Sequence, residues 1–242
     1  MNCLARLFGA KQEQPKESEP VPIENVAPVP ISVVPKRLRG IDVSHYEPEV
    51  DWVKAKASGV VWMYTKATEG LGHVDAMLNN HVKGANLAGV YTGAYHFFHA
   101  SQDGKQQASV FLNNISNLSL DLIHCLDWES SSADGLPALI QKARAKDWLN
   151  EVERVTGKVP MIYGGESFLN ELNLGPEFLK YKVWIAHYGV PESRVKVPAP
   201  WVKYTAWQYT DAEGPPIVQG LKPGHHVDAS WLNGSIDLLR KS

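Results

Sequence analysis

From residue 40 onward, short β-type runs rich in Val, Ile, Tyr and Trp alternate with helical stretches at 51–58, 76–88, 103–115 and 136–156. Such alternation predicts right-handed β-α-β units and a parallel sheet. Eight β-type runs over this length predict an α/β fold, a modified (β/α)8 TIM-like barrel. Its last connections should be irregular, because helical stretches become rare after residue 175. The runs are RGIDVSHY, GVVWMYTKATEG, GVYTGAYHFF, LIHCLDWES, VPMIYGG, KVWIAHYG, TAWQYTD and HHVDASWL.

An open, doubly wound sheet is the alternative architecture. It would carry a glycine-rich phosphate loop after an early strand, and the chain has no GxGxxG or GxxxxGK[ST] motif. Within 136–156, apolar residues recur at a helical spacing, which predicts a buried stripe. The stripe comprises Leu139, Ala143, Trp148, Leu149 and Val152.

The sequence divides at residue 40 into an N-terminal arm, 1–39, and a catalytic barrel, 40–242. Residues 11–36 contain six prolines and neither glycine nor aromatic residues. Proline removes an amide donor and fixes φ, so this segment is predicted to be an extended or disordered linker.

Composition excludes several classes of function. The net charge of −2 gives no basic surface for nucleic acid. Cys3 and Cys125 form neither a disulfide framework nor a CxxC pair. No apolar run approaches the ~20 residues that span a bilayer, and the N-terminal apolar patch is too short for a secretion signal. We therefore expect no stable membrane insertion.

Polar side chains end nearly every predicted strand. In a β/α barrel the carboxyl ends of the strands form the active-site face, whereas a purely structural core would place Val, Leu or Ile there. This pattern predicts one polar site at the mouth of the barrel. Its residues are Asp42, Ser44, Lys66, Thr68, Glu69, Tyr95, His96, Asp127, Glu129, Tyr163, Trp184, Tyr188, Gln208 and Asp228.

Asp127 and Glu129 are the central pair of this set. On a strand, residues i and i+2 face the same side with Cα atoms about 6.6–6.8 Å apart, so both carboxyl groups should face one cleft while Trp128 faces the helices. Like charges at this spacing resist joint ionisation, which raises one pKa. A protonated acid beside an ionised carboxylate suits cleavage of a glycosidic bond.

A carboxylate pair held by Lys or Arg for structure alone is the competing interpretation. Asp42 and Asp228 on other strands favour catalysis, because four converging carboxylates are costly to bury. Aromatic residues at strand ends suit sugar rings, whose C–H faces stack on them. Tyr95, Tyr163, Trp184 and Tyr188 are the predicted platforms, and Trp62, Trp128 and Trp148 are assigned to packing.

Three other functions are compatible with parts of the pattern. A metal-dependent amide hydrolase could use Asp42, His45, His96 and His99, although strand one has no HxH motif and His96 and His99 would face opposite sides. A glycan-binding barrel without turnover would need no acid set. A chitinase-like hydrolase would carry a DxxDxDxE run, whereas residues 120–126 read LDLIHCL.

The motifs GIDVSHYE, YTKATEG, GAYHFF, LDWES, PMIYGG, WIAHYG, AWQYT and VDAS resemble those of glycoside hydrolase family 25 lysozymes. The resemblance covers residues 40 to about 232. It implies an N-acetylmuramidase, endolysin-like, that cleaves the β-1,4 bond between N-acetylmuramic acid and N-acetylglucosamine in peptidoglycan. It implies no cofactor and no metal. We expect a monomer that reaches the cell wall after release from a phage host cytoplasm, or by secretion.

The resemblance also assigns roles to residues. The catalytic acid falls on Glu129, its partner on Asp127 and the supporting acids on Asp42 and Asp228. Asp127 either attacks C1 or holds the substrate's acetamido group, and the sequence leaves both retaining routes open. Two departures, Glu47 for an amide and His73 for an aromatic or Leu, affect substrate contacts. The expected substrate-binding residues are Tyr95, Lys66, Glu69, Tyr163, Trp184, Tyr188 and Gln208.

Overall fold

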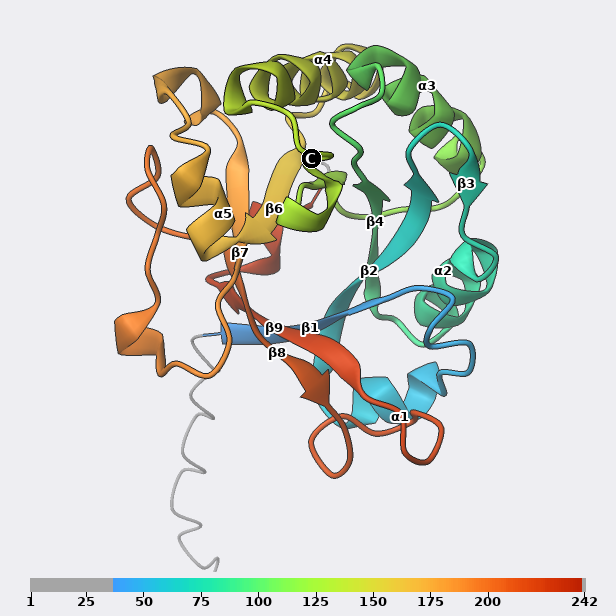
Figure 1. The fold of residues 1–242 in the computed structure, drawn as a ribbon. Helices are drawn as coiled ribbons and strands as arrows, with labels where there is room; N and C mark the ends of the chain where they lie inside the picture. Colours follow the sequence, from blue (N-terminus) through green and yellow to red (C-terminus); the bar gives the residue numbers. More distant parts are fainter. Residues whose placement is uncertain (1–36, 241–242) are drawn as a thin grey trace, which may run out of the picture. The chain divides into compact units, whose positions relative to one another are not determined.

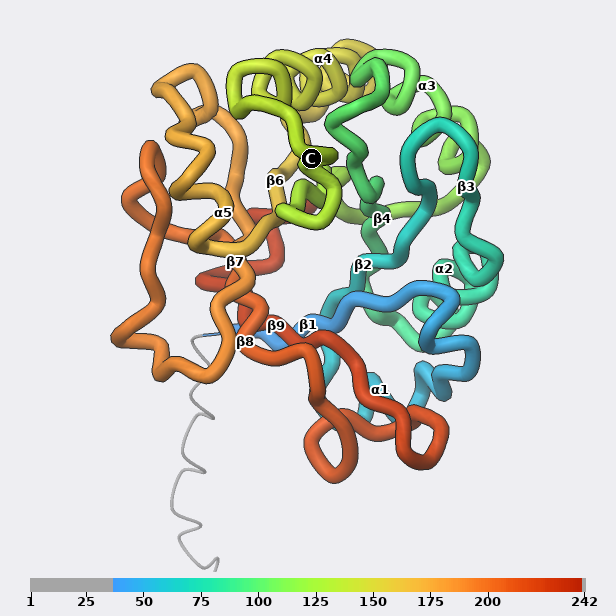
Figure 2. The backbone as a smooth tube through the Cα atoms, viewed as in Figure 1, coloured from blue at the N-terminus to red at the C-terminus, as the bar shows by residue number. Residues whose placement is uncertain are grey.

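The computed structural model describes residues 37–240, which form a closed α/β barrel (Figures 1 and 2). The sheet closes because β1 pairs with β2 on one side and with β9 on the other. The predicted barrel is thereby confirmed, and each predicted β-type run supplies one of its strands. The barrel strands are β1 (Arg37–Val43), β2 (Val60–Glu69), β4 (Tyr91–Phe97), β5 (Cys125–Asp127), β6 (Met161–Gly165), β7 (Lys182–Ala186), β8 (Ala206–Glu213) and β9 (Val227–Asn233).

Strand β1 begins at Arg37, three residues before the predicted start of the barrel. The arm predicted for residues 1–39 therefore falls mostly outside the described residues and stays a prediction. A further short strand, β3 (His73–Val74), pairs antiparallel with the end of β2. Among residues 37–240, no helix is both long enough and apolar enough to cross a bilayer.

The end of the barrel departs from a regular β-α-β repeat. Among the barrel strands, which do not include β3, neighbours from β1 to β8 run parallel, whereas β9 runs antiparallel to both β8 and β1. Between β7 and β8 the only described helix is a 3₁₀ turn, η3 (Glu192–Arg194). The expectation that Asp228 follows the carboxyl end of its strand is wrong. Asp228 is the second residue of β9, and the reversed direction of β9 brings it opposite Asp42.

The helices lie outside the barrel, as Figure 1 shows for α2, α3 and α4. Two of them start at an aspartate whose carboxylate accepts an N–H of the first turn: Asp51 from Lys54 (3.1 Å) and Asp103 from Gln106 (2.8 Å). The four predicted helical stretches are confirmed, and α5, directly after β6, was missed. The helices are α1 (Trp52–Ala57), α2 (Leu78–Leu87), α3 (Gly104–Ile115), α4 (Ala138–Thr156) and α5 (Glu166–Glu171).

The buried face of α4 differs from the predicted stripe. Leu139 is 74% exposed and Ala143 is also exposed, whereas Gln141 and Ala145 are buried with Trp148. Gln141 belongs to this face because its amide nitrogen donates to the Leu136 carbonyl at 2.7 Å and its oxygen accepts the indole N–H of Trp128. A polar residue with its hydrogen bonds satisfied can occupy a buried helical position that an apolar periodicity does not reveal.

Alternate residues of the same strands build two apolar layers. Residues such as Ile41, Leu126 and Ile162 pack outward against the helices, together with Trp128 and Trp148. The inner layer contains a cluster of large rings, in which Trp184 lies 5.6 Å from Trp62 and 5.3 Å from Tyr64 between ring centroids. Trp62, Trp128 and Trp148 are fully buried, which confirms their assignment to packing.

We predict that Gly40→Ala destabilises the barrel. A Cβ at Gly40 would lie 2.1 Å from two ring atoms of Trp62, and Trp62 is enclosed on every side. Overpacking of this kind typically costs about 1–3 kcal/mol. Urea unfolding measures the loss. The matched control is Gly72→Ala, since a Cβ at Gly72 would meet no atom within 4 Å. Equal stability of the two variants would contradict the packing of Trp62 against β1.

Candidate active site

The inward-facing residues near the rim are polar, and they lie above the aromatic layer. Strand register brings them together, because Asp42 pairs with Asp228 across β1 and β9, and Asp127 pairs with Tyr163 across β5 and β6. Residues spread over most of the chain thus contribute to one site. The sequence prediction of a polar site at this end of the barrel matches this arrangement.

Gln208 on β8 links two of the acids to two tyrosines. Its amide nitrogen donates to Asp42 Oδ2 at 3.0 Å and to Asp228 Oδ2 at 3.1 Å. Its amide oxygen accepts the hydroxyl groups of Tyr163 (2.6 Å) and Tyr188 (2.5 Å). An ionised carboxylate only accepts hydrogen bonds and the tyrosine hydroxyl groups can donate, so this orientation of the amide satisfies both of its ends. Gln208 therefore fixes the positions of both acids.

The pKa of each of these acids is raised. Burial raises the pKa of Asp42 well above its ordinary value, the charge of Asp228 adds to the effect, and the Gln208 hydrogen bond opposes it. Burial, followed by the charges of Glu47 and Asp211, raises the pKa of Asp228 to about 7. This corner of the site consequently retains protons that exposed carboxyl groups lose.

Asp127 and Glu129 lie where β5 ends. Asp127 is the last residue of the strand, and the backbone remains extended at Glu129 (φ −119°, ψ 162°). Trp128 between them is fully buried against Phe98 and Phe168 on the helix side. The alternation that the sequence predicts therefore holds beyond the strand, and it directs the two acids away from Trp128.

These two acids also bind protons more tightly than exposed carboxyl groups. Asp127 is 6% exposed, and burial together with the charge of Glu129 raises its pKa well above the ordinary value. Burial also raises the pKa of Glu129, although Ser131 Oγ donates to Glu129 Oε2 at 3.1 Å and the charge of Lys66 opposes the rise. The sequence assigns the proton of the pair to Glu129, whereas the deeper of the two acids is Asp127.

Lys66 is a cation that acts on this pair. Its positive charge lowers the pKa of both Asp127 and Glu129. Its ammonium group contacts Glu69 Oε2 at 2.5 Å and lies over the Phe97 ring. Glu69 Oε1 in turn meets His99 Nε2 at 3.1 Å, and His99 Nδ1 lies 3.5 Å from Asp134. Lys66 and Glu69 are thus a bound pair at the rim.

A small pocket opens beside Asp127 and reaches the aromatic layer. The exposure of Trp184 is only 2%, and its indole N–H donates to Ser230 Oγ at 3.0 Å. The role of Trp184 as an open stacking platform is therefore wrong, because the side chain is buried and only lines this pocket. Tyr188, at 42% exposure, keeps a free surface. The pocket is lined by Tyr95, Cys125, Asp127, Tyr163 and Trp184.

The histidine set of the metal-dependent alternative is not brought together. His96 is fully buried on the helix side of β4, where its Nδ1 lies 2.7 Å from Thr68 Oγ1 and its Nε2 lies 3.1 Å from Gln107 Oε1. Both ring nitrogens are engaged and burial lowers the pKa of His96 to about 4. His96 and Thr68 therefore support the fold.

Several residues of the site escaped sequence reasoning. Ser131 follows Glu129 by two residues, and only its hydroxyl contact identifies it. Asp134 reaches His99 from a turn where its own φ is 54°. Glu47, predicted only as a departure from a family pattern, contributes charge to Asp42 and Asp228. The spacing of these residues carries no signal, because loops bring them to the rim.

Comparison with known proteins identifies the family. Residues 41–216 match the model of Glycosyl hydrolases family 25. The chain belongs to this family. It is a glycoside hydrolase, and its four rim acids lie on the fold of family 25.

Individual family 25 relatives support the assignment over nearly the whole barrel. Lysozyme M1 of Streptomyces globisporus is 31% identical over 209 residues, which is 82% of this chain and 68% of that protein. The N,O-diacetylmuramidase of Chalaropsis sp is 28% identical and aligns with 84% of this chain and 98% of its own. The crystal structure of the bacterial lysozyme from Streptomyces coelicolor superposes with a TM-score of 0.75, at 30% identity, covering 84% of this chain and 94% of that one.

We predict that Asp228→Asn makes the family 25 barrel more stable at pH 8. The pKa of Asp228 rises from 3.8 to about 7 on folding, so its ionisation removes stability as the pH increases through that interval. Because the carboxyl is only partly buried, solvent screening limits the gain to about 1–2 kcal/mol. Urea midpoints between pH 4 and 8 measure it, with exposed Asp237→Asn as control. A variant that loses stability as steeply as the wild type would contradict this.

Proposed function

We propose that this protein is an N-acetylmuramidase that cleaves the β-1,4 bond between N-acetylmuramic acid and N-acetylglucosamine in peptidoglycan. The proposal rests on one observation above all: two carboxyl groups with raised pKa values stand two residues apart at the mouth of a family 25 barrel. The similar lysozyme and muramidase support the substrate class.

Glu129 is proposed as the general acid. It lies beyond the end of β5, and burial raises its pKa, so it keeps its proton to a higher pH than an exposed glutamate does. Ser131 Oγ donates to one carboxylate oxygen and thus fixes the orientation of the group. Glu129 gives its proton to the glycosidic oxygen and later takes one from water.

Asp127 is proposed to act on the reacting sugar rather than on the leaving group. It lies deeper than Glu129, at 6% exposure, and Oδ1 has no hydrogen-bond partner among residues 37–240. The pocket beside it, lined by Tyr95 and Tyr163, suits the methyl of an acetamido group. In that position Asp127 accepts the acetamido N–H, and the acetamido carbonyl oxygen attacks C1. Direct attack by Asp127 is the alternative retaining route.

The opposite side of the site binds and orients the glycan. Asp42 and Asp228 are held by Gln208, and their pKa values are raised, so they can donate to or accept from sugar hydroxyls. The exposed face of Tyr188 offers a stacking surface. Lys66 and Glu69 border the groove near the catalytic pair. Because one chain supplies all of these groups, the proposed site needs no second copy, and we propose a monomeric enzyme.

We predict that Glu129→Gln loses activity by roughly 10²–10⁴-fold, because glutamine keeps the shape but donates no acidic proton. The assay is the release of reducing ends from purified peptidoglycan, with mass spectrometry to show muramic acid at the new ends. Glu171→Gln, at an exposed position of α5, is the matched control. Thermal unfolding should give both variants the midpoint of the wild type within a few degrees.

The outcomes separate the alternatives. Near-normal release of reducing ends by Glu129→Gln would remove the assignment of the acid. Release of amino groups instead of reducing ends would indicate an amide hydrolase. Binding to cell walls without release by the wild type would indicate a non-catalytic barrel.

We also predict net retention at the anomeric carbon. Both routes through Asp127 displace the leaving group in two steps, so the configuration inverts twice. Proton NMR of the first products should show the β-anomer before mutarotation. Initial appearance of the α-anomer would instead require a water molecule between Asp127 and the sugar, and would contradict both routes.

A further inference from the structure

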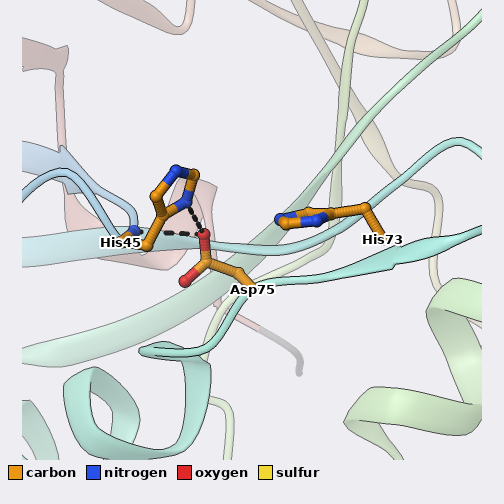
Figure 3. A group of neighbouring side chains, drawn as sticks. All are labelled: His45, His73 and Asp75. Atoms are coloured by element: carbon orange, nitrogen blue, oxygen red, sulfur yellow. Dashed lines mark hydrogen bonds and ion pairs between the residues drawn. The ribbon is translucent and has the colours of Figure 1, made fainter.

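We propose that His45, His73 and Asp75 form a binding site for a divalent transition-metal ion such as Zn²⁺. The three side chains come from two segments of the rim. His45 follows β1, and His73 and Asp75 lie on and just after β3. One ligand atom from each lies within 4.8 Å of the other two, and Figure 3 shows the His73 ring directed toward Asp75 and His45.

The three groups are chemically suited to such an ion. Imidazole nitrogen and carboxylate oxygen are ligands of Zn²⁺, which binds them at about 2.0–2.2 Å, and three protein ligands leave one position for water. Tetrahedral bonds of that length place neighbouring ligand atoms about 3.3 Å apart. Closing the site therefore requires the exposed His73 side chain to move toward the other two ligands, and His45 Nδ1 and Asp75 Oδ2, now 2.7 Å apart, to separate slightly.

Asp75 is preorganised for this role. Its side chain is fully shielded from solvent, and its Oδ1 accepts the Met77 N–H at 2.9 Å. Its Oδ2 accepts the His45 backbone N–H at 3.0 Å and lies 2.7 Å from His45 Nδ1. The Asp75 backbone N–H donates to the Ala67 carbonyl on β2. Two backbone donors thus hold the carboxylate next to the histidine, which reduces the ordering that ion binding requires.

The ion would link two segments of the rim of the barrel. His45 belongs to the loop that follows β1, the strand that carries Asp42. His73 pairs with Glu69 across the β2–β3 hairpin. The ligands are separate from the four rim acids, so the ion is expected to stabilise the rim and not to enter the chemistry. A ligand that binds only the folded state stabilises it by RT ln(1 + [L]/Kd), so stability rises with the concentration of free ion.

The test is titration of the full-length, metal-free protein with Zn²⁺ by calorimetry and with Co²⁺ by visible absorption. We expect one ion per chain, Co²⁺ bands of a site with four or five ligands, and a higher unfolding temperature with Zn²⁺. His73→Leu and Asp75→Asn should each weaken Zn²⁺ binding by at least about tenfold.

Two controls locate the ion. His226→Leu changes an exposed histidine outside the cluster, and Cys3→Ser removes a thiol outside the described residues; both should bind Zn²⁺ as the wild type does. The wild type should release reducing ends at the same rate in EDTA as with Zn²⁺, which separates this site from catalysis. Absence of stoichiometric binding by the wild type, or unchanged binding by His73→Leu and Asp75→Asn, would overturn the proposal.

Discussion

The hydrogen bonds from Gln208 to Asp42 and Asp228 are the interaction on which the active-site face depends. Without a donor between them, two carboxylates on paired strands would repel one another at the point where the barrel closes. Gln208 can serve both because its oxygen is occupied by Tyr163 and Tyr188, which leaves both N–H groups directed at the acids. The strands that close the sheet therefore also carry the residues of the site.

The aromatic layer beneath the rim contributes to the burial that raises the pKa values of the acids. Trp62, Tyr64 and Trp184 are buried inside the barrel, and Asp127 is only 6% exposed. The low polarity beneath raises the pKa values, and the nearby charges then act more strongly than they would in water. The same aromatic residues therefore form part of the core and contribute to the raised pKa values of the acids.

Much of this could be predicted from the sequence. The strand–helix order gave the barrel, and the i, i+2 spacing gave the shared direction of Asp127 and Glu129, because both patterns are local. The antiparallel β9, the buried Gln141 and the enclosed position of Trp184 could not be predicted. Each is determined by a partner far along the chain: β1 for Asp228, Trp128 for Gln141 and Ser230 for Trp184. The contact between His99 and Asp134 could not be predicted either, because loops bring these two residues together.

The two sides of the site differ in electrostatic character, and the difference assigns their roles. Near β5, Lys66 partly offsets the burial of Asp127 and Glu129, so this pair can exchange a proton with a substrate. Near β9 the neighbouring groups are further acids, Glu47 and Asp211, which strengthen proton retention at Asp228. A group that must give up its proton in each turnover belongs beside the cation, and a group that holds a hydroxyl belongs among the acids. This difference supports the proposal that the chemistry takes place at β5 and that β1 and β9 bind the glycan.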